Sequence, residues 1–167
     1  GCQVKNAGDL PVEDAGKLPV ALFVVELLTT VARHEHENRQ LFEFVDASID
    51  VLELDGEHTA NFHLVFMTML TRLVGIAPDE ETYAAGSWLD LREGCFTLLR
   101  PAHQDVAQPE VARRIALFLR GGFEGVAMPM NRDERNCCLD ALMDYYRLHL
   151  PSFPELKSVA ILRQLFQ

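Results

Sequence analysis

Histidine and acidic side chains near residue 35 are of types that bind metals or transfer protons. His34 and His36 flank Glu35, and imidazole and carboxylate groups are common metal ligands. The spacing differs from the H-E-x-x-H pattern that places two imidazoles on one helical face, and no third ligand follows closely. We therefore interpret the segment as a polar connection between helices. The alternative is a metal enzyme that uses His34, His36 and Glu26.

Two polar residues lie inside apolar segments. Glu26 interrupts an apolar run and has no visible catalytic partner, so we expect it to pair with an arginine or to help cap a neighbouring helix. His63 lies between Phe62 and Leu64, where a hydrogen-bonded packing histidine is the expected role. His58 is five residues away, a spacing that suits a shared helical face poorly. The chain also lacks nucleotide-binding and nucleophile-elbow motifs, and we predict that it is not an enzyme.

The four cysteines, Cys2, Cys95, Cys137 and Cys138, contain no C-x-x-C pair that would indicate a zinc ribbon or a thioredoxin-type site. Neighbours on a helix point about 100° apart, so one of the pair at 137–138 can face the core while the other lies at its margin. Free, structural cysteines of this kind are typical of a reducing, cytoplasmic setting.

The stretch from Arg135 to Lys157 is the best candidate for an interaction surface. It contains the run Tyr145 to His149, and Tyr and Arg are enriched at protein interfaces. Two prolines follow this run and should turn the chain sharply, which would bring Arg147 close to Lys157. The alternative is that the tyrosines lie at the margin of the core and the charges are simply solvated.

The charge of the chain is acidic and unevenly distributed. Its 15 Lys and Arg residues stand against 25 Asp and Glu, a net charge of -10. Residues 1–108 carry seven basic and eighteen acidic residues, whereas residues 109–167 carry eight and seven. Phosphate backbones repel such a chain, which argues against a free-standing nucleic-acid binder. An acidic partner should prefer the C-terminal part.

Length and composition indicate one globular domain. The chain has 167 residues, 49% hydrophobic and 24% charged, which excludes disordered and collagen-like classes. Residues 1–16 resemble a linker, and no further domain boundary appears in residues 17–167. No secretory signal is visible, and the run from Leu18 to Ala32 is shorter than the roughly 20 residues of a membrane span. We therefore expect no membrane association.

The apolar periodicity predicts an all-α bundle of about six helices with one small β-hairpin insertion. The first and third helices are apolar almost all round, which is typical of buried central helices. Asn38, Asn131 and Ser152 are expected to cap helices, Pro109 to open one and Gly75 to end one. The helices are expected near residues 18–32, 38–54, 59–74, 109–121, 131–150 and from 152 onward.

Residues 77–108 interrupt the helical periodicity. Two short apolar runs, 87–91 and 95–99, flank the turn Arg92-Glu93-Gly94. This pattern predicts a β-hairpin that must pack on the helices to be stable. We expect Trp88 and Phe96 to form its inner face.

Three segments occur in an order that is typical of one protein family. They are Pro19-Val20-Ala21-Leu22-Phe23-Val24-Val25-Glu26-Leu27-Leu28, then Ala60-Asn61-Phe62-His63-Leu64, then Tyr145-Tyr146-Arg147-Leu148-His149-Leu150-Pro151-x-Phe153-x-x-Leu156-Lys157-Ser158. Together they resemble the RecO family of DNA repair and recombination mediators, in particular its Bacteroidetes-type branch. The resemblance covers about residues 17–166, which correspond to the helical C-terminal region of that family.

The resemblance implies two differences from other members of the family. RecO proteins carry an N-terminal OB-fold domain that contributes DNA binding. This chain has no room for it, so the resemblance implies that residues 1–16 are a linker or a remnant of that domain and that DNA contact lies mainly in the missing part. Many members also bind zinc through four cysteines in the region of residues 77–108. Only Cys95 occurs there, so we expect no zinc and no other cofactor.

The resemblance also implies a function in recombinational DNA repair. Such proteins help to load recombinase on single-stranded DNA coated by single-strand-binding protein, anneal strands and work with RecR. The acidic tail of single-strand-binding protein would need an apolar pocket with a cationic rim. The candidate residues are Arg135, Arg147, Lys157, Arg163, Leu148, Leu162 and Phe166. The alternative function is a helical domain that binds or senses a small molecule in a pocket between the apolar helices.

Overall fold

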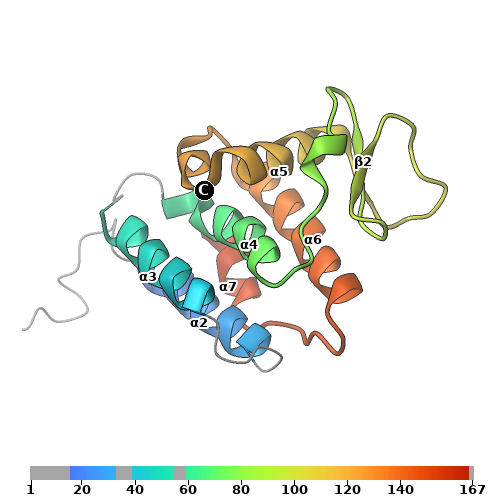
Figure 1. Cartoon of the computed structure of the whole chain (residues 1–167). Coiled ribbons are helices and arrows are strands. Elements are labelled where there is room, and N and C mark those ends of the chain that lie inside the picture. The colour runs from blue at the N-terminus through green and yellow to red at the C-terminus, as the bar shows by residue number, and fades with distance from the viewer. Residues whose placement is uncertain (1–15, 33–38, 55–58, 166–167) are drawn as a thin grey trace, which may run out of the picture.

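A computed structural model describes residues 16–32, 39–54 and 59–165 of the chain. These residues form six α-helices and a small three-stranded sheet, which confirms the predicted mostly helical fold with a β insertion (Figure 1). The helices are α2 (Lys17–Ala32), α3 (Arg39–Leu54), α4 (Phe62–Leu73), α5 (Pro109–Gly121), α6 (Arg132–His149) and α7 (Val159–Gln164). Within these ranges, no helix combines the length and apolarity that crossing a membrane requires.

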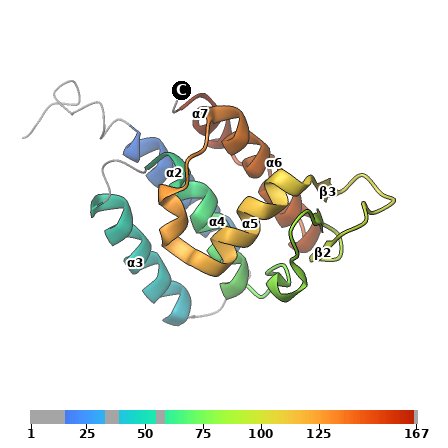
Figure 2. The ribbon, with the colours of Figure 1, turned by 90° about the horizontal axis from the view of Figure 1, so that it is seen from above.

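Helix α4 is the centre of the bundle and packs against α2, α3, α5 and α6 (Figures 1 and 2). Nine of its residues are buried, as its apolar sequence predicts. Its C-terminus is closed by Gly75, whose φ of +79° suits a residue without a Cβ atom. The backbone N–H of Ile76 donates to the carbonyl of Thr71 over 2.9 Å, which completes the expected glycine cap.

Helix α2 differs from the prediction that it is buried on all sides. Val20, Phe23 and Leu27 are fully buried, but Leu18 is 64% exposed and Val25 60% exposed. The reason is that α2 lies at the edge of the bundle, with α3 across a groove rather than packed tightly against it. The Nζ atom of Lys17 donates to the backbone oxygen of Glu53 over 3.1 Å, so the start of α2 meets the end of α3 and the two helices are antiparallel.

Aromatic side chains attach α3 to the bundle. Phe44 of α3 stacks on Phe66 of α4, with ring centroids 5.1 Å apart, and on Phe123, 5.9 Å away. Phe123 lies in a short 3₁₀ helix (Gly122–Ala127) after α5, and Phe62 stacks against both Phe66 and Phe123. This four-ring cluster positions α3, whose predicted cap Asn38 lies outside the described residues.

The sheet has the order β2-β1-β3 with antiparallel pairs: β1 (Trp88–Asp90), β2 (Cys95–Thr97) and β3 (Val106–Ala107). The predicted hairpin is confirmed, but the prediction for its inner face was wrong at Trp88. Leu89 pairs with Phe96 and both are buried, whereas Trp88 pairs with Thr97 and lies half-buried beneath the Arg100 guanidinium. Successive residues of a strand face opposite sides, so Leu89 and Phe96 share the inner face and Trp88 faces the other side.

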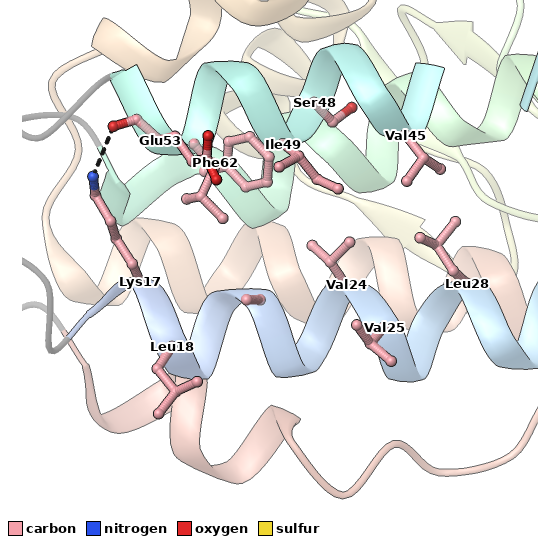
Figure 3. Close-up of a pocket in the computed structure, with 12 residues that line it drawn as sticks. Lys17, Leu18, Val24, Val25, Leu28, Val45, Ser48, Ile49, Glu53 and Phe62 are labelled. Carbon is pink, nitrogen blue, oxygen red and sulfur yellow. Dashed lines mark hydrogen bonds between the residues drawn. The ribbon is translucent and has the colours of Figure 1, made fainter. Parts of the chain in front are cut away.

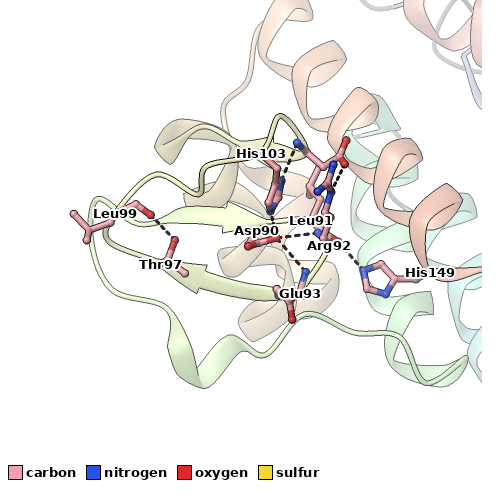
Figure 4. Close-up of polar contacts among 9 residues, drawn as sticks. Asp90, Leu91, Arg92, Glu93, Thr97, Leu99, His103 and His149 are labelled. Atoms are coloured by element: carbon pink, nitrogen blue, oxygen red, sulfur yellow. Dashed lines mark hydrogen bonds and ion pairs between the residues drawn. The ribbon is translucent and has the colours of Figure 1, made fainter.

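A polar network around Asp90 holds the hairpin loop (Figure 4). Its Oδ1 atom accepts hydrogen bonds from the backbone N–H groups of Arg92 and Glu93 and lies 3.0 Å from Nε2 of His103. Desolvation would raise the pKa of Asp90, but these hydrogen bonds and the neighbouring histidine lower it below the ordinary value. His149 of α6 lies 2.7 Å from the carbonyl of Leu91, so the sheet is fixed to the bundle.

The two C-terminal helices begin differently. The predicted capping box of α6 is confirmed. Oδ1 of Asn131 accepts a hydrogen bond from the backbone N–H of Glu134, and Oε2 of Glu134 accepts one from the backbone N–H of Asn131. The predicted helix start at Ser152 was wrong, because α7 begins only at Val159. Pro154 explains the difference, since proline disfavours the helical conformation of the residue before it.

Candidate functional site

A hollow of about 420 Å³ lies between the C-terminal half of α6 and the segment 155–163. Three cationic side chains line it, Arg147 from α6, Lys157 from the connecting segment and Arg163 from α7. The remaining lining residues are Met143, Glu155, Leu156, Val159 and Ala160. The sequence argument for a turn that brings Arg147 and Lys157 together therefore agrees with the observed geometry. An apolar surface rimmed by cations can hold an anionic group attached to an apolar one.

The three cations differ in how strongly they are engaged. Arg147 donates to Asp144 over 3.0 Å, and Arg163 is paired with Asp140. Lys157 is exposed and has no ion pair among the residues that the structure describes. Exposed ion pairs contribute only about 0–1 kcal/mol, so an incoming carboxylate can replace either aspartate at small cost. Lys157 is the cation that is immediately available.

Buried contacts hold the walls of this hollow in place. Tyr146 is fully buried, and its hydroxyl donates to the carbonyl of Met67 over 2.7 Å. Tyr145 is also buried and donates to the carbonyl of Ile76. Burial raises the pKa of both tyrosines above the ordinary value. Of the two roles left open by the sequence, the structure gives these tyrosines the core role, and they position α6 rather than contact a partner.

A second anchor joins the segment before α7 to α2. Oε2 of Glu26 accepts a hydrogen bond from the backbone N–H of Ser158 over 3.3 Å, and Ser158 is the N-cap residue of α7. This is the helix-capping role that the sequence allowed for Glu26. The contact fixes the residue directly after Lys157, so it also fixes one wall of the hollow.

The other predicted site residues lie elsewhere. Arg135 is buried, and its Nη1 atom donates to the carbonyl of Met130 over 2.6 Å. Leu162 is buried in the core, and Leu148 is 44% exposed but outside the lining of the hollow. Phe166 lies outside the described residues.

Sequence reasoning missed the residues that form the apolar floor. Met143 and Leu156 are almost fully buried, and Val159 is half-buried beside them. It also missed the aspartates that engage the arginines. The spacing of Asp144 and Arg147, three residues apart on a helix, was a signal that could have found one of these pairs.

The buried histidine and cysteines have structural environments. His63 packs edge-on against Phe23 with ring centroids 6.1 Å apart. Desolvation, with a smaller effect of the Arg135 charge, lowers the pKa of His63 to about 3. Its packing role is as expected, but Nδ1 has no hydrogen-bond partner among the described residues. Of the two neighbouring cysteines, one of which was expected to face the core, Cys138 is buried and Cys137 is exposed, and burial raises the pKa of Cys138 to about 12.

The structure describes neither side chain of the His34 and His36 pair, and His58 and Cys2 also lie outside the described residues. In the part that is described, no group of three or more His, Cys, Asp or Glu side chains is placed to hold a metal ion.

The larger groove, between α2 and α3, has mostly apolar walls. Two of its polar side chains are engaged within the protein: Ser48 donates to the carbonyl of Phe44 over 2.6 Å, and Lys17 donates to the backbone carbonyl of Glu53. The Glu53 carboxylate is the remaining polar group in the lining and lies at its exposed rim. A small-molecule site usually presents convergent polar groups that fix the ligand. The described walls of this groove therefore do not favour the alternative function, a helical domain that binds or senses a small molecule.

Comparisons with known proteins agree on one family. The family model described as recombination protein O C terminal matches residues 12–159. The chain is 42% identical over 154 residues to the DNA repair protein RecO of Phocaeicola vulgatus, which is 92% of this chain and 64% of that relative. It is 42% identical over 155 residues to RecO of Bacteroides fragilis, which again covers 92% of this chain and 64% of that relative. It is 40% identical over 153 residues to RecO of Porphyromonas gingivalis, which covers 88% of this chain and 61% of that relative. The chain thus spans slightly less than two thirds of these relatives. No solved structure gives a significant match.

Proposed function

Because the chain belongs to the RecO family of DNA repair proteins, we propose that it acts in recombinational DNA repair as a protein-interaction domain with no catalytic activity of its own. The relatives are named DNA repair proteins. The interaction role rests on the hollow between α6 and α7, whose lining combines three cationic side chains, one acidic side chain, Glu155, and an apolar floor. In this proposal the domain works in the cytoplasm, and DNA contact is made mainly by an OB-fold domain outside this chain.

The proposed ligand of this hollow is the acidic C-terminal tail of single-strand-binding protein. The apolar tip of the tail would lie against Val159 and Ala160, above the buried Met143 and Leu156. Its carboxylates would meet Arg147, Lys157 and Arg163. The charge distribution supports binding of the tail at this hollow, because the excess of acidic over basic residues lies in residues 1–108 and is absent from residues 109–167. An acidic peptide therefore meets the least repulsion near α6 and α7. Binding of the tail would bring the domain to coated single strands, where recombinase is loaded.

Substitution of the rim cations should weaken binding of an acidic peptide that ends in an apolar residue. We expect Lys157→Ala or Arg147→Glu to reduce the affinity at least about tenfold, because the bound peptide would exclude water from these contacts, and truncating one partner of a desolvated charge pair costs about 2–5 kcal/mol. Both side chains are on the surface, so the fold should be retained. Fluorescence titration with a labelled peptide measures the effect.

Arg113→Ala is the matched control, since Arg113 is half exposed on α5 and lies outside the hollow. Its affinity should stay within about twofold of the unsubstituted protein. Unchanged affinity in both Lys157→Ala and Arg147→Glu would place the tail elsewhere. If the unsubstituted protein does not bind the peptide at all, RecR becomes the leading proposed partner.

A further inference from the structure

A second surface, of opposite charge, lies on the far side of the bundle from the β-sheet. We propose that the groove between α2 and α3 is a docking site for a basic amphipathic helix of a partner protein. The groove has a volume of about 570 Å³, and its walls are formed by two antiparallel helices (Figure 3). The proposal is independent of the α6–α7 hollow.

The walls of this groove are apolar and open to solvent. Val24 and Leu28 project from α2 toward Val45 and Ile49 of α3, whereas Leu18 and Val25 lie at the rim on the flank of α2 that points away from α3 (Figure 3). With Ala21 included, residues 18, 21, 25 and 28 of α2 are three or four apart, as are residues 45 and 49 of α3, so each wall is a continuous ridge. At one end the Lys17–Glu53 hydrogen bond joins the two helices. The exposed apolar surface extends outward along α2, where Leu22 is 53% exposed. An open apolar ridge of this kind favours association with another apolar surface.

The rim of the groove is acidic on the α3 side only. Asp46, Asp50 and Glu53 lie on the outer flank of α3 next to Ile49, and all three are exposed. They form no ion pair with any described residue, whereas Glu43 is paired with Arg39 over 3.1 Å. Residues 40–71 contain six acidic residues and no Lys or Arg. The outer flank of α2 is instead apolar. A complementary ligand therefore needs one apolar face and lysines or arginines along the side that lies over α3.

Charge also argues against two other occupants. A second copy of the chain would bring a net charge of -10 against an acidic rim. The chain's own N-terminal segment, residues 1–15, carries three acidic residues and one lysine. Neither the second copy nor the N-terminal segment complements the carboxylates of Asp46, Asp50 and Glu53, which no described residue pairs. A basic amphipathic helix complements both this acidic rim and the apolar walls.

The test uses a fluorescein-labelled peptide of about 15 residues, with leucines at i, i+3, i+4 and i+7 and lysines beside them. A matched peptide has glutamate at every lysine position. We expect the unsubstituted protein to bind the lysine peptide at least about tenfold more tightly than the glutamate peptide. Val25→Asp should weaken lysine-peptide binding at least about tenfold, and so should the double substitution Asp46→Lys, Asp50→Lys.

The controls separate the groove from non-specific attraction. Leu117→Asp on α5 is the apolar control, because Leu117 is 42% exposed outside the groove. Glu124→Lys is the charge control, and Lys157→Ala tests the other surface. All three variants should bind the lysine peptide with an affinity within about twofold of that of the unsubstituted protein.

Three results would overturn the proposal. The first is equal affinity for the lysine and glutamate peptides, or a loss of lysine-peptide affinity in the control variants as large as the loss in Val25→Asp. The second is sedimentation showing a dimer that Val25→Asp dissociates, which would assign the groove to a second copy. The third is at least about tenfold tighter peptide binding by the double variant Leu10→Asp, Val12→Asp, which would assign the groove to the chain's own N-terminal segment.

Discussion

The free energy of unfolding should be about 2–3 kcal/mol lower at pH 4.5 than at pH 6.5, and His63 should cause this loss. The imidazole is buried against Phe23, and its pKa in the folded protein is about 3 instead of the ordinary 6.5. The unfolded chain therefore binds a proton at a pH where the folded protein does not. The stabilisation is fully present above pH 6.5 and is lost as the pH falls toward 3, at about 1.4 kcal/mol for each pH unit in that window.

Urea unfolding at pH 6.5, 5.5 and 4.5 measures this loss, and His63→Leu should remove most of it. His103→Gln is the matched control, because the His103 side chain beside Asp90 is 20% exposed, whereas His63 is almost fully buried, and its loss should leave most of the acid sensitivity in place. The lowered pKa of Asp90 acts in the same direction, but only below its ordinary value of 3.8, outside the measured range. An equally steep pH dependence in His63→Leu would show that other groups cause the acid sensitivity.

Phe66→Ala should lower the free energy of unfolding by about 3–5 kcal/mol, the usual cost of truncating a fully buried phenylalanine. Phe66 has no exposed surface and stacks on both Phe44 and Phe62. Its removal would leave a cavity at the contact that attaches α3 to α4. Amide hydrogen exchange should therefore accelerate in α3 more than in α6.

Phe42→Ala is the control on α3, where Phe42 is 75% exposed. Truncation of such a side chain should change the stability by no more than about 0.5 kcal/mol. Denaturant titration of both variants gives the comparison. Similar losses for Phe42 and Phe66 would contradict the observed aromatic cluster.

Features determined by a few neighbouring residues could be predicted from the sequence. The capping box of Asn131 and Glu134 lies within one helical turn, and Gly75 ends α4 through its own conformational freedom. Pro109 opens α5 in the same local way. The expected start at Ser152 failed because Pro154 competes with helix formation there.

Features that depend on distant contacts could not be predicted. Trp88 and Leu89 are both apolar, and strands of three residues are too short for a hydrophobic pattern to identify the inner face. The apolar outer face of α2 looked like a buried surface, because hydrophobicity alone does not distinguish a core contact from an open groove.

The α6–α7 hollow was predicted only in part for the same reason. The prolines after α6 indicated that Arg147 and Lys157 would lie close together. Met143 and Val159, however, line the hollow only because α7 folds back beside α6, a contact that leaves no local signal.

Chemical-shift mapping of the ¹⁵N-labelled chain during titration with an acidic peptide that ends in an apolar residue tests the proposed function most directly. The proposal predicts that the largest backbone shifts occur at Met143, Arg147, Leu156, Lys157 and Val159, around the hollow, and that Lys157→Ala abolishes them at the same peptide concentration. Shifts concentrated along α2 and α3, or no shifts at saturating peptide, would contradict it.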